Sequence, residues 1–206
     1  MTPAATIVLA VVLPILAGPL IVLAGRRPNL REAVTLITGG GTFLVVLSLL
    51  PAVMAGGRPE VTILEVLPGL ALGFQVEPLG MLFGLVASGL WIVTSLYSIG
   101  YVRGHHETDQ TRYFFFFAVA ITAAIGVAFS RNLLTLFIFY ELLTLSTYPL
   151  VTHTRTSEAM KGGRVYLGIL ISTSVTFLLL AILWTWHLTG TLEFTPGGIL
   201  AGHADS

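Results

Sequence analysis

Long apolar stretches joined by short polar segments make up most of this sequence. Crossing the hydrocarbon core of a bilayer takes about 20 apolar residues in a helix. Six stretches meet or approach that length, and we expect helices at residues 4–24, 33–55, 79–102, 113–129, 133–151 and 165–189. The segments between them are too short for a separate soluble domain. The sequence therefore predicts an all-α membrane protein, in which residues 1–206 form a single domain, a bundle of about six transmembrane helices.

The composition supports a membrane location. Hydrophobic residues make up 55% of the chain and charged residues 10%, whereas an ordinary soluble domain carries about 25% charged residues. The absence of cysteine excludes disulfides, thiolate metal sites and iron–sulfur clusters within this chain. A formal net charge of zero provides no global basic field for nucleic acid. The first apolar stretch has no basic segment before it and is too long for a signal peptide, so we expect it to stay in the mature protein.

Basic residues lie unevenly on the two sides of the predicted bundle. The connections after the first, third and fifth helices hold eight of the 10 Lys and Arg residues, whereas the other side holds only Arg58 and Arg131. Lys and Arg near the ends of spans are retained in the cytoplasm. We therefore expect both termini to lie outside, in a multi-pass protein of the bacterial inner (plasma) membrane.

The longest connection, residues 56–78, is apolar in places but is interrupted by charged and turn-forming residues. Its short β-prone runs around Pro68 and Gly69 indicate an external hairpin rather than a seventh span. We expect this hairpin to cover helix ends. The external tail, residues 190–206, leaves the last helix through turn residues and looks like a loop whose next element is missing.

The stretch FIFYELLTLSTYPLV, residues 137–151, holds a carboxylate, Glu141, near the midpoint of the fifth predicted helix. A charge at this depth costs at least about 2.5 kcal/mol, so such residues usually face the bundle interior and have a partner. Residues three and seven positions further along share the same helix face, which adds the hydroxyl groups of Thr144 and Tyr148. We predict that Glu141 is a proton carrier and that Thr144 and Tyr148 line its path. A structural Glu, satisfied by neighbouring hydroxyls or by the backbone, is the alternative.

A cation to pair with Glu141 is missing from the predicted spans. Arg131, Lys161 and Arg164 lie at span edges, and His187 lies near the outer end of the last helix. That helix also supplies hydroxyl residues at mid-depth, at positions 172–174 and 176, although Ser and Thr in membrane helices often bond their own backbone. The sequence thus supplies the carboxylate of a charge pair but not the cation, which is half of a site.

The segment RGHHETDQTR, residues 103–112, contains ligand types for Zn or Ni in His105, His106, Glu107 and Asp109. They follow one another in a connection rather than sharing one face of a helix, so a solvated loop is the preferred interpretation. The sequence contains no nucleophile triad, no nucleotide-binding loop and no haem motif. We expect no cofactor, no metal site and no enzymatic activity of the chain by itself.

Four segments resemble landmarks of the antiporter-like membrane subunits shared by Mrp-type cation/proton antiporters and respiratory complex I. These are GLALGFQVEPLGMLFGLV, LYSIGYVRG, RNLLTLFIFYELLTLSTYPLV and SEAMKGGRVYLGILIS. The resemblance covers the chain from about Gly69 to Leu192, and its most specific piece is the aromatic–Glu pair in FYELLTLSTYPLV. Tyr140 stands where the family more often has Trp or Phe, and Glu77 stands where many members have Asp.

This resemblance implies a bundle of about fourteen helices built on inverted repeats, of which the chain would be the N-terminal part. It also implies that Glu141 pairs with a Lys on the seventh helix, which this chain does not contain, and hands protons toward the middle of the subunit. The implied function is that of a proton-translocating subunit, A- or D-like, or an N-terminal fragment of one, in a multisubunit Na⁺/H⁺ antiporter. Its partners would be other membrane subunits and the lipid bilayer. A membrane-arm subunit of a complex I-like NADH:quinone oxidoreductase or hydrogenase, and a non-conducting scaffold fragment, are the alternatives.

The uneven distribution of basic residues generates a test of topology. Single cysteines introduced at His106 and at Ser206 should react with a membrane-impermeant thiol reagent from opposite faces of the membrane. Labelling of both positions from the same face would contradict the predicted orientation.

Overall fold

The computed structural model describes residues 1–67 and 70–202. The predicted Pro68–Gly69 turn and the last four residues of the predicted tail, 203–206, lie outside the described residues. In chain order the elements are α1 (Pro3–Leu23), α2 (Pro28–Leu47), α3 (Leu50–Met54), β1 (Glu60–Leu67), β2 (Leu70–Gln75), α4 (Pro78–Gly104), α5 (Gln110–Ala128), α6 (Leu133–Val151), α7 (Ser157–Thr173), η1 (Ser174–Leu179) and α8 (Leu180–Thr189).

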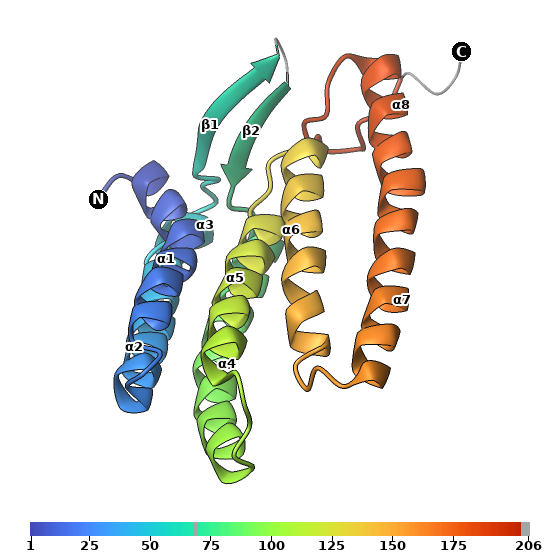
Figure 1. The fold of residues 1–206 in the computed structure, drawn as a ribbon. Helices are drawn as coiled ribbons and strands as arrows, with labels where there is room; N and C mark the ends of the chain where they lie inside the picture. The colour runs from blue at the N-terminus through green and yellow to red at the C-terminus, as the bar shows by residue number, and fades with distance from the viewer. Residues whose placement is uncertain (68–69, 203–206) are drawn as a thin grey trace.

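Six helices in the described part of the chain are long and apolar enough to cross a membrane. Two of them combine elements, because α2 and α3 form the span Pro28–Met54 and α7, η1 and α8 form the span Ser157–Thr189. Figure 1 shows these rods side by side, with β1 and β2 at one end. The expected class, an all-α bundle of six transmembrane helices, is confirmed, and the chain is a multi-pass membrane protein.

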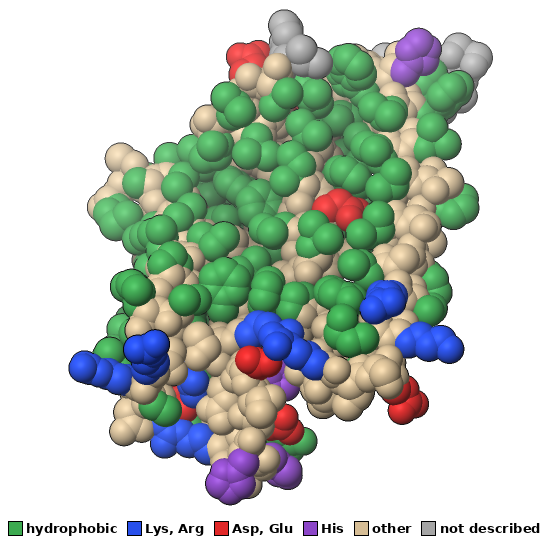
Figure 2. Space-filling model, viewed as in Figure 1, with side chains coloured by type: hydrophobic (Ala, Val, Ile, Leu, Met, Phe, Trp, Pro, Cys, Tyr) green, Lys and Arg blue, Asp and Glu red, His purple; other side chains and the backbone are tan. Residues whose placement is uncertain are grey.

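The two ends of the bundle differ in charge. At one end lie the connections α1–α2, α4–α5 and α6–α7, which we call the arginine-rich end, and Lys and Arg side chains gather along this edge in Figure 2. The opposite end carries the two strands, and we call it the hairpin end (Figure 1).

Two helices begin before their apolar stretches do. Pro28 occupies the first turn of α2, a position that suits proline because its missing N–H is not needed there. Thr156 caps α7 by accepting a hydrogen bond from the N–H of Ala159 at 3.1 Å, so α7 begins at Ser157 rather than near residue 165. As a result, several charged residues that we expected in the connections belong to helices α2 and α7.

The best-packed part of the bundle lies around α5. The apolar window of α5 is 50% buried, whereas those of α6 and of the last span are 17% and 11% buried. The largest fully buried side chains include Trp91 from α4, Phe114 from α5, Phe129 after α5 and Ile7 from α1. The core thus joins α1, α2, α4 and α5, and leaves α6 to α8 on one flank.

The strands β1 and β2 form an antiparallel hairpin in which Glu60 pairs with Gln75. This hairpin is tied to the connection between α5 and α6, because the N–H of Gln75 donates to Phe129 O at 2.7 Å and the N–H of Arg131 donates to Gly73 O at 3.1 Å. The connection it covers leads directly into α6. Whether the hairpin lies outside the cell stays a prediction.

A close contact between Gly126 of α5 and the ring of Phe139 seats α6 against the core. A methyl group at position 126 would collide with that ring. We expect Gly126→Ala to lower the midpoint of thermal unfolding in detergent, because overpacking of this kind typically costs about 1–3 kcal/mol.

Gly40→Ala is the matched control for this prediction. No atom lies within 4 Å of a Cβ at this helical glycine, and alanine favours a helix by about 0.5–1 kcal/mol over glycine. The control variant should therefore unfold at the parental midpoint or above it. Equal midpoints for the two variants would contradict the proposed seating of α6.

Candidate functional site

Glu141 lies in the middle of α6, among apolar neighbours in the sequence. Its side chain is partly buried, and its Oε1 is buried without a hydrogen-bond partner in the part of the chain that the structure describes. Figure 2 shows an acidic side chain surrounded by hydrophobic ones at mid-height of this face. Leaving a buried charged acceptor without a partner is expensive, so the position calls for a partner or a proton.

The depth of Glu141 follows from the point where α6 begins, which Asn132 determines. The Oδ1 of Asn132 accepts hydrogen bonds from both the N–H and the hydroxyl of Thr135, each at 2.9 Å. Its Nδ2 donates to Ala71 O in the hairpin at 2.7 Å and to Glu193 Oε1 in the tail at 3.1 Å. A single buried side chain therefore caps α6 and joins it to two other segments.

The other two predicted path residues lie on the same helix. Thr144 is buried, and the half-buried ring of Tyr148 packs on α7, where a Cβ added to Gly163 would come within 3.2 Å of it. No direct hydrogen bond joins Glu141, Thr144 and Tyr148 within the described residues. From Glu141 to Tyr148 the helix rises about 10 Å, so a proton moving between these groups would need water or side-chain movement.

Tyr148 also reaches an opening at the arginine-rich end. It lines a cavity of about 470 Å³ together with Arg112, Thr152 and Arg155. That volume accommodates several water molecules, each of which takes up about 30 Å³ in the liquid. The face of α6 that starts at Glu141 therefore leads to a cavity at the arginine-rich end of the bundle, which two arginines help to line.

Hydroxyl groups of the last span bond to their own helix, as Ser and Thr often do in membrane helices. Thr173 donates to Ile169 O at 2.9 Å, and Ser174 donates to Ile171 O at 3.1 Å. Sequence reasoning missed a hydroxyl contact that joins this span to α6, between Thr147 of α6 and Tyr166 of α7 at 3.2 Å.

Sequence reasoning also missed the π-helical segment η1 within the last span. It follows Thr173 directly and contacts α6. Segments of this kind are rare and often lie at functional sites. No pattern in the sequence indicates it.

None of the ion pairs in the described part of the chain includes Glu141. Arg131 pairs instead with Glu193 at 2.7 Å at the hairpin end. Arg112 donates to the carbonyls of Thr152 and His153 at 3.3 and 3.0 Å. Arg131 and Arg112 are thus engaged elsewhere.

A buried charge network at the arginine-rich end was also missed, because the sequence placed its members in a connection. Arg31 and Glu32 of α2 are both buried, and they form an ion pair at 3.3 Å. Glu32 also accepts hydrogen bonds from Arg103 of α4 at 2.9 and 2.6 Å. Pro28 at the start of α2 was the available signal, since it moves the helix start ahead of both charges.

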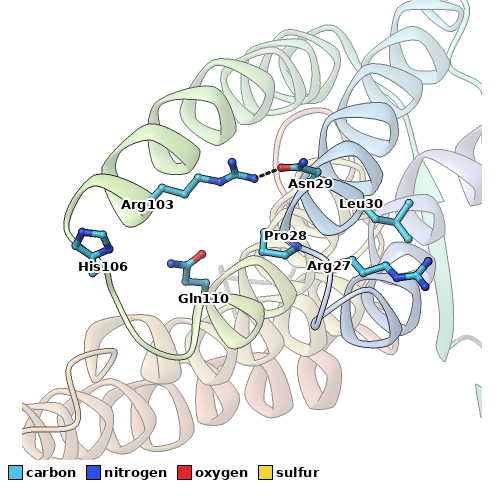
Figure 3. A pocket seen from close by; sticks show the side chains of 7 residues that line it. All are labelled: Arg27, Pro28, Asn29, Leu30, Arg103, His106 and Gln110. Atoms are coloured by element: carbon cyan, nitrogen blue, oxygen red, sulfur yellow. Dashed lines mark hydrogen bonds between the residues drawn. The ribbon is translucent and has the colours of Figure 1, made fainter.

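A surface hollow of about 680 Å³ lies beside this network. In Figure 3, Arg103 points to Asn29, to which it donates at 2.6 Å, whereas Arg27 points away from both. Gln110, on the far side of the hollow, accepts from Arg31 at 2.7 Å. The polar groups pair with one another rather than converge on a ligand, so the network holds the ends of α2, α4 and α5 together.

The histidines of the α4–α5 connection lie on the surface. The Nδ1 of His105 is 2.9 Å from Tyr101 O, and its ring stacks on Tyr101 with centroids 4.2 Å apart. Among the described residues no group of three or more His, Cys, Asp or Glu could hold a metal ion.

Comparison with known proteins shows what this chain is similar to. Residues 130–199 match the family described as "NADH:quinone oxidoreductase/Mrp antiporter, TM". The Na(+)/H(+) antiporter subunit A1 of Staphylococcus aureus strain bovine RF122 / ET3-1 is 31% identical over 123 residues, or 59% of this chain. The same subunit from strain JH9 is 29% identical over 123 residues. The chain spans 15% of the length of these curated relatives.

Two solved structures have a similar fold. The Mrp complex from Dietzia sp. DQ12-45-1b contains a chain with a TM-score of 0.79 and 21% identity, and the match covers 94% of this chain and 36% of that one. The membrane-bound sulfane sulfur reductase, an archaeal respiratory membrane complex, gives a TM-score of 0.77 at 20% identity, with coverage of 91% and 38%. At these identities the likeness shows the fold alone. Together with the sequence matches, it confirms the predicted resemblance to the antiporter-like membrane subunits.

The Asn132 interactions generate a stability prediction. Asn132→Ala should lower the midpoint of thermal unfolding in detergent, because it removes a helix cap worth about 1 kcal/mol and takes a buried donor from Ala71 O and Glu193.

Thr156→Ala is the control, since the exposed side chain of Thr156 caps α7 through a single N–H. Losing this cap alone should cost about 1 kcal/mol or less, so the Asn132 variant should lose clearly more stability. Equal losses would mean that Asn132 acts as an ordinary cap and does not join the three segments.

Proposed function

We propose that this chain is a proton-translocating subunit, or the N-terminal part of one, in a multisubunit Na⁺/H⁺ antiporter of the Mrp type. The observation that carries the proposal is Glu141, a carboxylate at mid-helix in a membrane span with a buried oxygen lacking a partner among the described residues. The likeness to Na(+)/H(+) antiporter subunit A1 and to the Mrp complex supports this class of transport.

In this proposal Glu141 carries the proton, and Thr144 and Tyr148 line the route to it. Water in the cavity beside Tyr148 would exchange protons with the cytoplasm. A hydroxyl group can accept one hydrogen bond and donate another, and water can bridge gaps that direct contacts leave open. Glu141 would take up a proton from this route and release it when a cation approaches, because a nearby positive charge favours the carboxylate. That cation would come from another part of the assembly.

The proposed orientation puts the arginine-rich end in the cytoplasm and both termini outside, in the inner membrane of a bacterial cell. The retention of Lys and Arg on the cytoplasmic side supports it. The cavity beside Tyr148 would then open to the cytoplasm, and the hairpin would cover the external end of α6.

Other membrane subunits are the proposed partners. The last span leaves most of its apolar surface uncovered, since its window is only 11% buried. Helices in lipid associate through packing and polar contacts rather than through the hydrophobic effect, and Glu141 needs a polar contact on this flank of the bundle. Exposed apolar side chains on the span include Val165, Ile169, Phe177, Leu180, Leu183 and Trp184.

A redox-driven proton pump is the second candidate, and the fold of the sulfane sulfur reductase favours it. In such an assembly Glu141 would keep the same role, while Na⁺ would have no part in the transport. Proton movement that depends on added Na⁺ would support the antiporter, and proton movement that depends only on an electron donor would support the pump.

Glu141→Gln in the complete assembly tests the proton carrier directly. Glutamine keeps the size and hydrogen-bonding capacity of the side chain but cannot ionise, so transport in membrane vesicles should fall to near zero with assembly unchanged. Glu141→Asp keeps the acid with a shorter reach and should retain partial transport if water bridges the gap. Assembly is measured separately, because loss of a buried charge can also impair folding. A Gln variant that assembles and transports like the parent would rule out Glu141 as the carrier.

A further inference from the structure

His153 follows α6 by two residues, and neither of its ring nitrogens has a role in the site described so far. Both are buried and have no hydrogen-bond partner in the part of the chain that the structure describes. An unpaired buried donor or acceptor costs about 1–3 kcal/mol. An imidazole in this state therefore needs an explanation beyond packing.

The ring lines a cavity of about 460 Å³ at the arginine-rich end. Most of the other lining residues have side chains that can exchange a proton, among them Tyr97, Ser98, Tyr101, Glu107 and Tyr113. A cavity of this size holds several waters, each needing two to four polar partners. Both ring nitrogens of His153 are buried in this structure, so a movement of the ring into the cavity would bring them into contact with that water.

Tyr113 sets the position of the ring. Its own ring stands edge-on to that of His153, with centroids 5.7 Å apart and an interplanar angle of 71°. Its hydroxyl lies 2.9 Å from the Ser98 hydroxyl, which links α4 to α5 beside the cavity. His153 is thus held against two helices rather than free in a loop.

Two consecutive residues line different cavities, His153 this one and Thr152 the one beside Tyr148. Thr152, which is 2% exposed, lines the second cavity, and its hydroxyl donates to Tyr148 O at 2.8 Å. Arg112 also lines the second cavity and donates to the carbonyls of Thr152 and His153. His153 therefore directly follows, in the chain, a residue that lines the start of the proposed route to Glu141.

Charged groups of both signs lie near His153. Glu107 lines the same cavity, and Arg112 contacts the backbone of His153. Arg155, two residues further along the chain, forms an ion pair with Asp109 at 3.1 Å. The remaining titratable groups of the cavity are Tyr97, Tyr101 and Tyr113.

We propose that His153 exchanges protons between the aqueous cavity and the route through Tyr148 to Glu141. The inference rests on the proposed proton transport. A histidine gains and loses its charge between about pH 5 and 8, and it can accept a proton at one ring nitrogen and release one from the other. A water in the cavity gives a proton to one nitrogen, the opposite nitrogen gives its proton to a water on the Tyr148 side, and each transfer conserves charge and atoms. Reverse transfer follows the same steps.

His153→Gln in the complete assembly tests this role in vesicles. We expect the transport rate to fall about tenfold at pH 8, where protons are scarce, and by much less at pH 6. Added imidazole should restore part of the lost rate, because it fits the cavity and replaces the missing proton-exchanging group. Loss of a purely structural histidine would produce neither the pH-dependent loss nor the rescue.

Two further variants make the result decisive. His187→Gln makes the same replacement at an exposed histidine of α8, outside this cavity, and should keep the parental rate and pH profile, with no effect of imidazole. Glu141→Gln should be inactive with or without imidazole, and activity of that variant would overturn the proposed function rather than the role of His153. If His153→Gln assembles poorly, the smaller His153→Asn replaces it. A His153 variant that assembles and keeps the parental rate and pH profile would overturn the inference, as would a loss independent of pH and not rescued by imidazole.

Discussion

The side-chain amide of Asn132 joins three parts of the molecule at the hairpin end. It caps α6 through Thr135 and holds Ala71 of the hairpin and Glu193 of the tail at the same point. The first N–H groups of a helix need partners that the helix itself does not provide, and lipid provides none. Glu141 lies nine residues further along α6, about 13 Å deeper. A start displaced by one residue would turn that carboxylate by about 100° and point it at a different neighbour.

The two sides of α6 are held with unequal strength. Towards α5, the ring of Phe139 fills the space over Gly126 in a contact that admits no larger residue. Towards α7, few side chains are buried, and the polar contact between Thr147 and Tyr166 lies near the surface. Regions with few buried apolar contacts open more readily than well-packed ones. Glu141 lies on the helix between a well-packed side and a loosely packed one, so a partner on the loosely packed side can approach it without disturbing the rest of the bundle.

The sequence alone was sufficient for the number of spans and for the face shared by Glu141, Thr144 and Tyr148. Both follow from properties that lie along the chain, namely apolar length and helical spacing. Arg31 and Glu32 were misplaced because a charge ends an apolar stretch, whereas a pair of opposite charges can continue a helix once each finds a partner. His153 carries no local pattern at all. Its burial depends on Tyr113, 40 residues earlier, and only the packing of α5 against α6 brings the two together.

The π-helical segment η1 divides the last span into two halves whose buried faces point in different directions. Each α-helical residue advances the direction of side chains by about 100°, and a π turn takes up an extra residue within a single turn. Tyr166, before η1, contacts α6, and Ile182, beyond it, is buried although its neighbour Trp184 is 62% exposed. The face that contacts neighbouring helices in the half at the arginine-rich end is therefore not continued at the same helical spacing in the half at the hairpin end. Removing one residue from η1 would shorten the span very little, but it would turn the whole half at the hairpin end towards new neighbours.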